Sequence, residues 1–267
     1  EDGTMAVAIP ASRLSFMAVE AVASPVSISE DYRKARNEMM VISVEEWMPI
    51  LLELETNHPI QRKLLQYQGD FCALAKNKRG MFNASEQGLG KTTIGWCSAY
   101  LWKGQRILVV CPKSVIQQWR DEYFRIWEEG NRPYGVCTLD FQTINTRRET
   151  LIKLGINTSL WPCAVITNFE VIDNLKDDIR KYSPDIIIID ESFRVSNPEA
   201  KVTKALWEIC DKAKHVLLLT GTPIGNRGAA SLYSQLRMLG QDIVPEKYWD
   251  FVSRYCEMNL LQIGARQ

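Results

Sequence analysis

The chain has 267 residues, of which 46% are hydrophobic and 24% charged, so it can bury a sizeable core in one large domain or two small ones. Its 32 basic residues balance 32 acidic ones, which excludes bulk charge as a sign of a nucleic-acid or membrane partner. No apolar stretch approaches the length of a membrane span.

The cysteines indicate the cellular compartment of the protein, and the first residue indicates that the chain belongs to a longer one. The 7 cysteines are scattered singly without a CxxC pair, which favours an intracellular chain (cytoplasm, nucleoid or nucleus) over a secreted one, a zinc site or a disulfide framework. The chain begins at Glu1 and not at a methionine, so we expect a processed or excised piece of a longer protein.

The first part of the chain, residues 1–57, is interpreted as an N-terminal accessory segment. Residues 4–29 lack the basic start and compact apolar core of a secretory signal, and we interpret them as peripheral. Residues 30–57 contain a charged, helix-like stretch and then MMVISVEEWMPILLELE, which predicts a strand followed by a helix. The main domain is expected to cover residues 58–267.

From about residue 60 onward, short β-branched runs alternate with helix-length segments. The runs lie at residues 80–84, 106–112, 134–140, 163–168, 185–191 and 215–222, and helices are expected within 92–103 and 114–129. Continuous apolar strands separated by helices are typical of a parallel sheet covered on both faces, so we predict an α/β fold with a mostly parallel sheet. Ligands of such sheets lie beyond the carboxyl ends of the strands, where SEQGLGKT, CPK, TN, DE and TGT all fall.

SEQGLGKT, residues 85–92, has the composition of a phosphate-binding loop. Gly88 and Gly90 permit backbone conformations that expose N–H groups, and the helix beginning near Lys91 directs its positive end at the phosphates. Lys91 adds a point charge, and Thr92 a magnesium ligand. The residues assigned to the triphosphate are Ser85, Glu86, Gln87, Gly88, Leu89, Gly90, Lys91, Thr92 and Thr93. A simple glycine turn before a helix is the alternative, and the loop alone would suit a kinase, a GTPase or a motor.

Asp190 and Glu191 follow four consecutive isoleucines that predict a buried strand. The charge of Asp190 should emerge at the strand end, where it can hold magnesium directly or through water, while Glu191 orients or deprotonates the attacking water. A solvated acidic turn is the alternative. With the phosphate loop upstream, the pair favours triphosphate hydrolysis, with Lys91, Asp190 and Glu191 as the catalytic residues.

Several segments, in the same order, resemble the first RecA-like lobe of a superfamily-two helicase and, within that class, of a Swi/Snf-type translocase of double-stranded DNA. The similar segments are GLGKT (88–92), CPKSV with QQW (111–119), VITNFE (165–170), DESF (190–193), LTGTP (219–223) and F…RYC (251–256). The resemblance covers roughly residues 60–260. It implies a RecA-like P-loop fold with ATP and Mg²⁺ as cofactors.

The resemblance also implies roles for single residues. Gln68, with Gln61 as its rival, would read the adenine edge. A DNA backbone would be held, without reading of its sequence, by Pro112, Lys113, Ser114, Gln117, Thr167 and Asn168, although ordinary loop capping is the alternative for each. Thr220, Gly221 and Thr222 would couple the triphosphate site to the nucleic-acid face. Trp119 is predicted to be a core residue, and no chemistry is assigned to His58 or His215.

Two positions depart from the family pattern. Ser85 stands where the family usually has an acidic residue, and Phe193 where it has a histidine that helps couple the triphosphate to the LTGTP segment. Phenylalanine cannot donate that hydrogen bond, so we expect altered coupling between hydrolysis and movement.

The function implied by the resemblance is that of a DNA-dependent ATPase that translocates on double-stranded DNA and remodels protein–DNA complexes. A second RecA-like lobe of the parent chain would supply an arginine finger worth ~10³–10⁵ in rate, so we expect weak ATP binding and slow hydrolysis from this lobe alone. The alternatives are a strand-separating helicase, a restriction-type motor subunit, or a nucleotide-switched interaction module with little turnover. Phe193 is the feature that keeps the last of these alternatives open.

Overall fold

The computed structural model describes residues 60–61, 64–139, 143–157, 162–224 and 228–256. The predicted accessory segment, residues 1–57, lies outside these ranges, as do the strand and helix expected within it. In the described ranges, no helix combines the length and the apolar character that crossing a bilayer requires.

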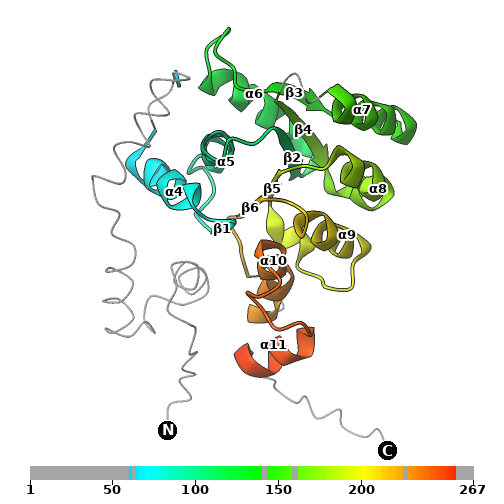
Figure 1. Ribbon diagram of the computed structural model, residues 1–267. Helices are drawn as coiled ribbons and strands as arrows, with labels where there is room; N and C mark the ends of the chain where they lie inside the picture. The colour runs from blue at the N-terminus through cyan, green and yellow to red at the C-terminus, as the bar shows by residue number, and fades with distance from the viewer. Residues whose placement is uncertain (1–59, 62–63, 140–142, 158–161, 225–227, 257–267) are drawn as a thin grey trace, which may run out of the picture.

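A parallel β-sheet forms the centre of the fold (Figure 1). Its strands are β1 (Gly80–Asn83), β2 (Arg106–Cys111), β3 (Gly135–Thr138), β4 (Cys163–Asn168), β5 (Ile186–Asp190) and β6 (His215–Leu219). They lie in the order β1-β6-β5-β2-β4-β3, and each neighbouring pair is parallel. Every predicted run contains one of these strands, so the prediction of a mostly parallel sheet is confirmed.

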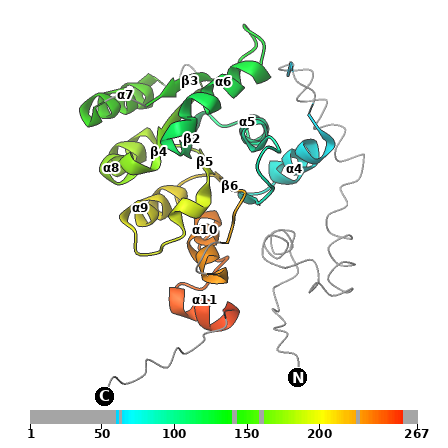
Figure 2. The same cartoon turned by 180° about the vertical axis from the view of Figure 1, so that it is seen from behind.

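Helices cover both faces of the sheet, and Figures 1 and 2 show the sheet between the two groups. One face carries α4 (Gln66–Lys76), α5 (Lys91–Leu101) and α6 (Ile116–Ile126). The other carries α7 (Ile144–Asn157), α8 (Ile172–Tyr182), α9 (Lys201–Cys210), α10 (Leu232–Leu239) and α11 (Tyr248–Tyr255). The short 3₁₀ turns are η1 (Lys113–Val115), η2 (Phe169–Val171), η3 (Ser192–Val195) and η4 (Ala229–Ser231).

The apolar pattern of the strands explains this layering. In β2, Ile107 and Val109 pack into the core on the α5 side, whereas Leu108 and Val110 pack into the core on the α8 side. All four side chains are fully buried, and each contributes roughly 1.5–3 kcal/mol by leaving water. Strands of this kind expose polar groups only at their ends, so polar binding or catalytic residues are expected where the strands end.

An aromatic cluster holds α6 against α5. Trp96, Trp119, Tyr123 and Trp127 are each at most 1% exposed, which confirms that Trp119 is a core residue. The Trp96 ring lies 5.7 Å from Trp119 and 4.9 Å from Tyr123, both edge to face. The indole N–H of Trp96 donates to the Trp119 carbonyl at 3.1 Å. The two helices are thus fixed to each other by packing and by a buried hydrogen bond.

An ion pair fastens the end of α9 to α10 on the other face. Both carboxylate oxygens of Asp211 accept hydrogen bonds from Arg237, at 2.8 and 3.1 Å, and Gln241 donates to Asp211 at 2.7 Å. Burial alone would raise the pKa of Asp211, but the hydrogen bonds from Arg237 and Gln241 outweigh it and hold that pKa below its ordinary value.

We expect Asp211→Asn to lower the free energy of unfolding by about 1 kcal/mol at pH 7. Because the folded-state pKa is depressed, this stabilisation is present above the unfolded pKa of about 3.9 and is lost as pH falls through the folded-state pKa. Urea titrations at pH 7 and pH 3 should therefore show a difference from the wild type that is smaller at pH 3 than at pH 7. Asp177→Asn, whose exposed carboxylate lies 3.7 Å from Arg180, is the matched control and should have little effect. A pH-independent difference for Asp211→Asn would contradict the assignment.

Candidate functional site

The polar segments that follow the strands share one edge of the sheet. Asn83 pairs with Leu219, and Leu219 pairs with Asp190, so the ends of β1, β6 and β5 lie at one level. Cys111 pairs with Asn168 at the ends of β2 and β4. Because all strands are parallel, the segments predicted to act together emerge at this carboxyl edge.

The phosphate-type loop lies between β1 and α5 and is closed by its own lysine. Gly88 and Gly90 adopt φ values of +83° and +72°, the left-handed region that glycine tolerates best. Lys91 Nζ donates to the carbonyls of Ser85 and Glu86 at 2.9 and 2.8 Å. An anionic ligand could replace these two carbonyls as the acceptor of the Lys91 hydrogen bonds.

Ser85, the position that departs from the family pattern, anchors this loop. Its hydroxyl donates to Asn83 Oδ1 at 2.5 Å, and its backbone N–H donates to the same oxygen at 3.0 Å. Asn83 is buried at the end of β1. The serine side chain therefore fixes the first residue of the loop to the strand.

Gln68, and not its rival Gln61, contacts the phosphate-type loop. Its amide N–H donates to the Leu89 carbonyl at 3.2 Å, and the Tyr67 hydroxyl donates to the same carbonyl at 2.7 Å. The amide oxygen of Gln68 accepts from the Leu65 N–H at 3.0 Å. The backbone of Gln61 instead bonds to Ile126 at the far end of α6. Gln68 is only 6% exposed, so both ends of its amide are used within the chain.

Asp190 is half-buried, and both of its carboxylate oxygens accept hydrogen bonds. Oδ2 accepts from the indole N–H of Trp119 at 2.8 Å, and Oδ1 accepts from the backbone N–H of Glu191 at 3.0 Å. Burial raises the pKa of Asp190 above its ordinary value, while these hydrogen bonds and the charge of Lys91 act in the opposite direction. Burial likewise lowers the pKa of Lys91, opposed by the carboxylates of Glu191 and Asp190. The three predicted catalytic residues thus share one electrostatic environment.

Glu191 leaves the strand in a strained conformation. Its φ of +53° lies in the left-handed region, which is costly for a residue with a β-carbon. The Thr220 hydroxyl donates to Glu191 Oε2 at 3.3 Å. Such strain persists only where neighbouring contacts hold the residue in place, and Thr220 supplies one of them.

The segment from Thr220 to Thr222 lies between Glu191 and the phosphate-type loop. The Thr222 N–H donates to Thr220 Oγ1 at 3.2 Å. A β-carbon on Gly221 would lie 3.0 Å from Gln87 Cγ and 3.8 Å from Lys91 Nζ. The predicted coupling residues therefore touch both halves of the site.

Sequence reasoning missed a buried glutamine that joins two of these segments. Gln235 of α10 is fully buried. Its amide oxygen accepts from the Ser192 hydroxyl at 2.8 Å, and its amide nitrogen donates to the Pro223 carbonyl at 2.9 Å. A single polar residue inside an amphipathic helix gives little signal in a sequence, because its partners lie far along the chain.

Thr93 does not face the loop to which it was assigned. Its side chain is 2% exposed and donates to Glu122 of α6 at 2.7 Å. This placement corrects the prediction for its side chain: Thr93 is the third residue of α5, and helix periodicity turns it toward the core.

The six residues predicted to hold DNA divide into two groups. Lys113, Ser114 and Gln117 are exposed where η1 leads into α6. The others, Pro112, Thr167 and Asn168, are buried. Thr167 and Asn168 end the interior strand β4 and are 0% and 4% exposed, so their side chains do not face solvent at this edge. Among the described residues, Thr167 Oγ1 and Asn168 Oδ1 have no hydrogen-bond partner.

The donors at this edge suit magnesium held together with phosphates. Within the described ranges, no group of three or more His, Cys, Asp or Glu residues could hold a metal by itself. Magnesium bound beside phosphates needs only one or two protein oxygens, since water and phosphate oxygens complete its shell. Asp190 and the half-buried Thr92, at the start of α5, provide such oxygens.

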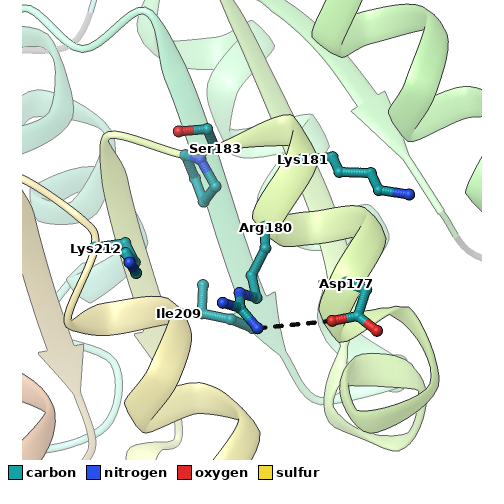
Figure 3. A pocket seen from close by; sticks show the side chains of 7 residues that line it. Asp177, Arg180, Lys181, Ser183, Ile209 and Lys212 are labelled. Atoms are coloured by element: carbon teal, nitrogen blue, oxygen red, sulfur yellow. Dashed lines mark ion pairs between the residues drawn. The ribbon is translucent and has the colours of Figure 1, made fainter.

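A separate cavity of about 510 Å³ lies at the opposite edge of the sheet (Figure 3). It is lined by Asp177, Arg180, Lys181, Ser183, Pro184, Ile209 and Lys212, from the ends of α8 and α9 and the turn before β5. Arg180 is already engaged by carboxylates, with Asp177 at 3.7 Å and Glu208 at 3.6 Å. None of the predicted site residues lies there.

Comparison with known proteins identifies similar chains. A profile of the SNF2-related domain family matches residues 39–256. The SWI/SNF-related matrix-associated actin-dependent regulator of chromatin subfamily A-like protein 1 of Xenopus tropicalis is 30% identical over 223 residues, which are 83% of this chain and 22% of that protein. The DNA annealing helicase and endonuclease ZRANB3 of Homo sapiens is 29% identical over 217 residues, 78% of this chain and 18% of that protein. The chain thus spans only about a fifth of the length of these relatives.

Solved structures show the same architecture. The Sulfolobus solfataricus SWI2/SNF2 ATPase core in complex with dsDNA aligns with a TM-score of 0.58 and 25% identity, over 75% of this chain and 40% of that one. The Pyrococcus furiosus Hef helicase domain aligns with a TM-score of 0.51 and 20% identity, over 67% of this chain and 37% of that one, and supports the fold alone.

The contact between Gly221 and the phosphate-type loop leads to a prediction. Gly221→Val should press on Gln87 and Lys91 with about 1–3 kcal/mol of strain. We expect hydrogen–deuterium exchange of residues 84–91 to become roughly tenfold faster. Gly135→Val is the control, because a β-carbon there would meet only the Pro162 carbonyl at 3.9 Å. Unchanged exchange in Gly221→Val would show that the two segments are not in contact in solution.

Proposed function

The chain belongs to the SNF2-related domain family and has the RecA-like α/β fold of superfamily-two helicases; from this premise, we propose that it is the ATP-binding lobe of a DNA-dependent ATPase that translocates on double-stranded DNA and remodels protein–DNA complexes. The observation that supports the proposal best is the cluster of Lys91, Asp190 and Glu191 at one sheet edge, with Thr220 bonded to Glu191. We propose that the lobe covers residues 58–267 and that residues 1–57 form an accessory segment. The family match begins at residue 39 and therefore includes part of that segment.

The phosphate loop is proposed to hold the triphosphate through its backbone N–H groups. Lys91, which now bonds to the carbonyls of Ser85 and Glu86, would exchange those bonds for phosphate oxygens. Thr92 and Asp190 would hold Mg²⁺. When bound, that ion neutralises charge on the phosphate oxygens. Gln68 is assigned to the adenine because it alone of the two candidate glutamines contacts the loop, and its amide would have to give up its bonds to Leu65 and Leu89.

Glu191 is proposed to orient the attacking water and to accept its proton. The hydrogen bond from Thr220 fixes one carboxylate oxygen, and the strained backbone holds the side chain at the end of β5. A general base works best when it is fixed before the substrate arrives. Thr220 would therefore couple the hydrolytic residue to the segment that also contacts Lys91 and Gln87.

DNA contact is proposed for the exposed residues Lys113, Ser114 and Gln117. They lie at the same sheet edge as the phosphate loop, and residues of these types bind backbone phosphates without reading sequence. The archaeal ATPase core that shares this fold was solved with double-stranded DNA, which supports the choice of partner. A second RecA-like lobe would complete the catalytic site, and the lobe alone should hydrolyse ATP slowly. We propose an intracellular location for this task, in the cytoplasm, the nucleoid or the nucleus.

The proposal predicts that Lys91 carries much of the nucleotide affinity. Lys91→Ala should remove charge-assisted hydrogen bonds worth about 1.5–3 kcal/mol, so affinity for Mg²⁺–ATP should fall roughly 10–100-fold. Isothermal titration calorimetry of the full chain measures this directly. Lys212→Ala, at the opposite edge of the sheet, is the control and should bind as the wild type does. Equal affinity of Lys91→Ala and wild type would overturn the proposed site.

The proposed translocase can be distinguished from two other functions by assays of the full-length protein, which would contain the second lobe. Phe193 is half-buried in η3, where the family has a coupling histidine, and this favours a nucleotide-switched interaction module as the second candidate. We expect the full-length protein to hydrolyse ATP faster with double-stranded DNA and to move along it without separating the strands. Absence of DNA-stimulated turnover would favour the switch, and strand displacement would favour a helicase or restriction-type motor.

A further inference from the structure

Trp119 bonds directly to the carboxylate proposed to hold magnesium. Among the tryptophans of the described residues, the buried Trp96 and Trp102 and the half-buried Trp207 donate their indole N–H groups to backbone carbonyls. Trp127 has no hydrogen-bond partner for its indole nitrogen among those residues. Trp119 instead donates to Asp190 Oδ2 at 2.8 Å.

We propose that Trp119 is a positioning residue, which fixes the orientation of the Asp190 carboxylate for magnesium and connects it to the DNA-facing end of α6. This inference rests on the proposed function, because it concerns the same nucleotide site.

The hydrogen bonds to Asp190 determine the plane of its carboxylate. Trp119 donates to Oδ2 and the Glu191 N–H donates to Oδ1, so rotation about the last side-chain bond would break both contacts. An ionised carboxylate has about four acceptor positions, which leaves lone pairs for a metal after these donors are counted. An indole N–H donates but never accepts, so it cannot compete with the carboxylate for a cation.

Packing prevents the indole of Trp119 from rotating on its own. Trp119 is 1% exposed, and its ring fills the space above Gly95 of α5, where a β-carbon would lie 2.7 Å from Cη2. The indole of Trp96 donates to the Trp119 carbonyl, and the two rings meet edge to face at 5.7 Å. Partners of metal ligands work in this way: they orient the ligand and are themselves held by packing.

The position of Trp119 along the chain gives the contact a second consequence. Lys113, Ser114 and Gln117 precede it by less than two helical turns, in η1 and the first turn of α6. Displacement of this short segment by a DNA backbone would shift the indole together with α6, because Gln117 and Trp119 belong to that helix and η1 leads directly into it. The hydrogen bond to Asp190 then carries the displacement to the metal-binding oxygen.

The test compares Trp119→Phe with Trp127→Phe in the full chain. Both variants remove one buried indole from the α6 region, but only the first removes a donor to Asp190. Calorimetry measures the affinity for a non-hydrolysable ATP analogue in EDTA and across a magnesium titration. Trp119→Phe should raise the half-saturating magnesium concentration about tenfold, with less than a twofold change in EDTA, whereas Trp127→Phe should change neither.

The results of these titrations distinguish an error in the positioning role of Trp119 from an error in the proposed function. Wild-type magnesium dependence in Trp119→Phe, or an equal loss with and without magnesium, would overturn the positioning role. A further loss of magnesium affinity on adding Trp119→Phe to Asp190→Asn would overturn it as well, since the effect has to pass through that carboxylate. Absence of nucleotide binding by the wild-type chain would instead overturn the proposed function.

A second measurement does not require Trp119→Phe to fold. In the ¹⁵N-labelled chain, the indole signal of Trp119 can be assigned through the protons of its own ring, of which those on Cη2 and Cζ3 face Gly95. Asp190→Asn should shift this signal more than any other indole signal, because the acceptor loses its charge. If this indole signal stays in place, the hydrogen bond is absent in solution and the inference fails.

Discussion

A carboxylate at the end of a fully buried strand has to be compensated, and the arrangement of the sheet edge follows from that need. Ile186 to Ile189 are at most 1% exposed, so Asp190 emerges directly from the core. Trp119 and the Glu191 N–H donate to it, and Lys91 supplies a nearby positive charge. Since an uncompensated charge at the end of a buried strand is destabilising, α6, the turn after β5 and the phosphate-type loop each contribute a group that compensates Asp190.

The loss of the family histidine does not disconnect the segments that it would join. Phe193 cannot donate a hydrogen bond, but the neighbouring Ser192 donates to Gln235, which in turn donates to Pro223. Thr220 bonds to Glu191 on the other side of the same turn. Fully satisfied buried polar networks make a structure rigid, so the two segments are held in a fixed relation by Gln235 of α10 and by Thr220, which directly follows β6.

The sequence predicted the strands, their parallel arrangement and the edge that carries the polar segments, because apolar periodicity and strand-end residues are local signals. It did not predict that Trp119 reaches Asp190, that Gln235 joins two loops, or that Thr93, Thr167 and Asn168 are buried. These facts depend on the strand order β1-β6-β5-β2-β4-β3, which brings together residues far apart in the chain. Local patterns show which residues are polar but not which helix or strand covers them.

The order of the strands also determines when the site can form. Strand β1, from which the phosphate loop extends, lies at the edge of the described sheet and pairs only with β6. During synthesis β1 emerges early, yet its partner, beginning at His215, emerges near the end of the described fold. Pairings of such long sequence separation form slowly. The phosphate-type loop is therefore among the last parts to be fastened, and a ligand of this loop would select chains whose sheet has already closed.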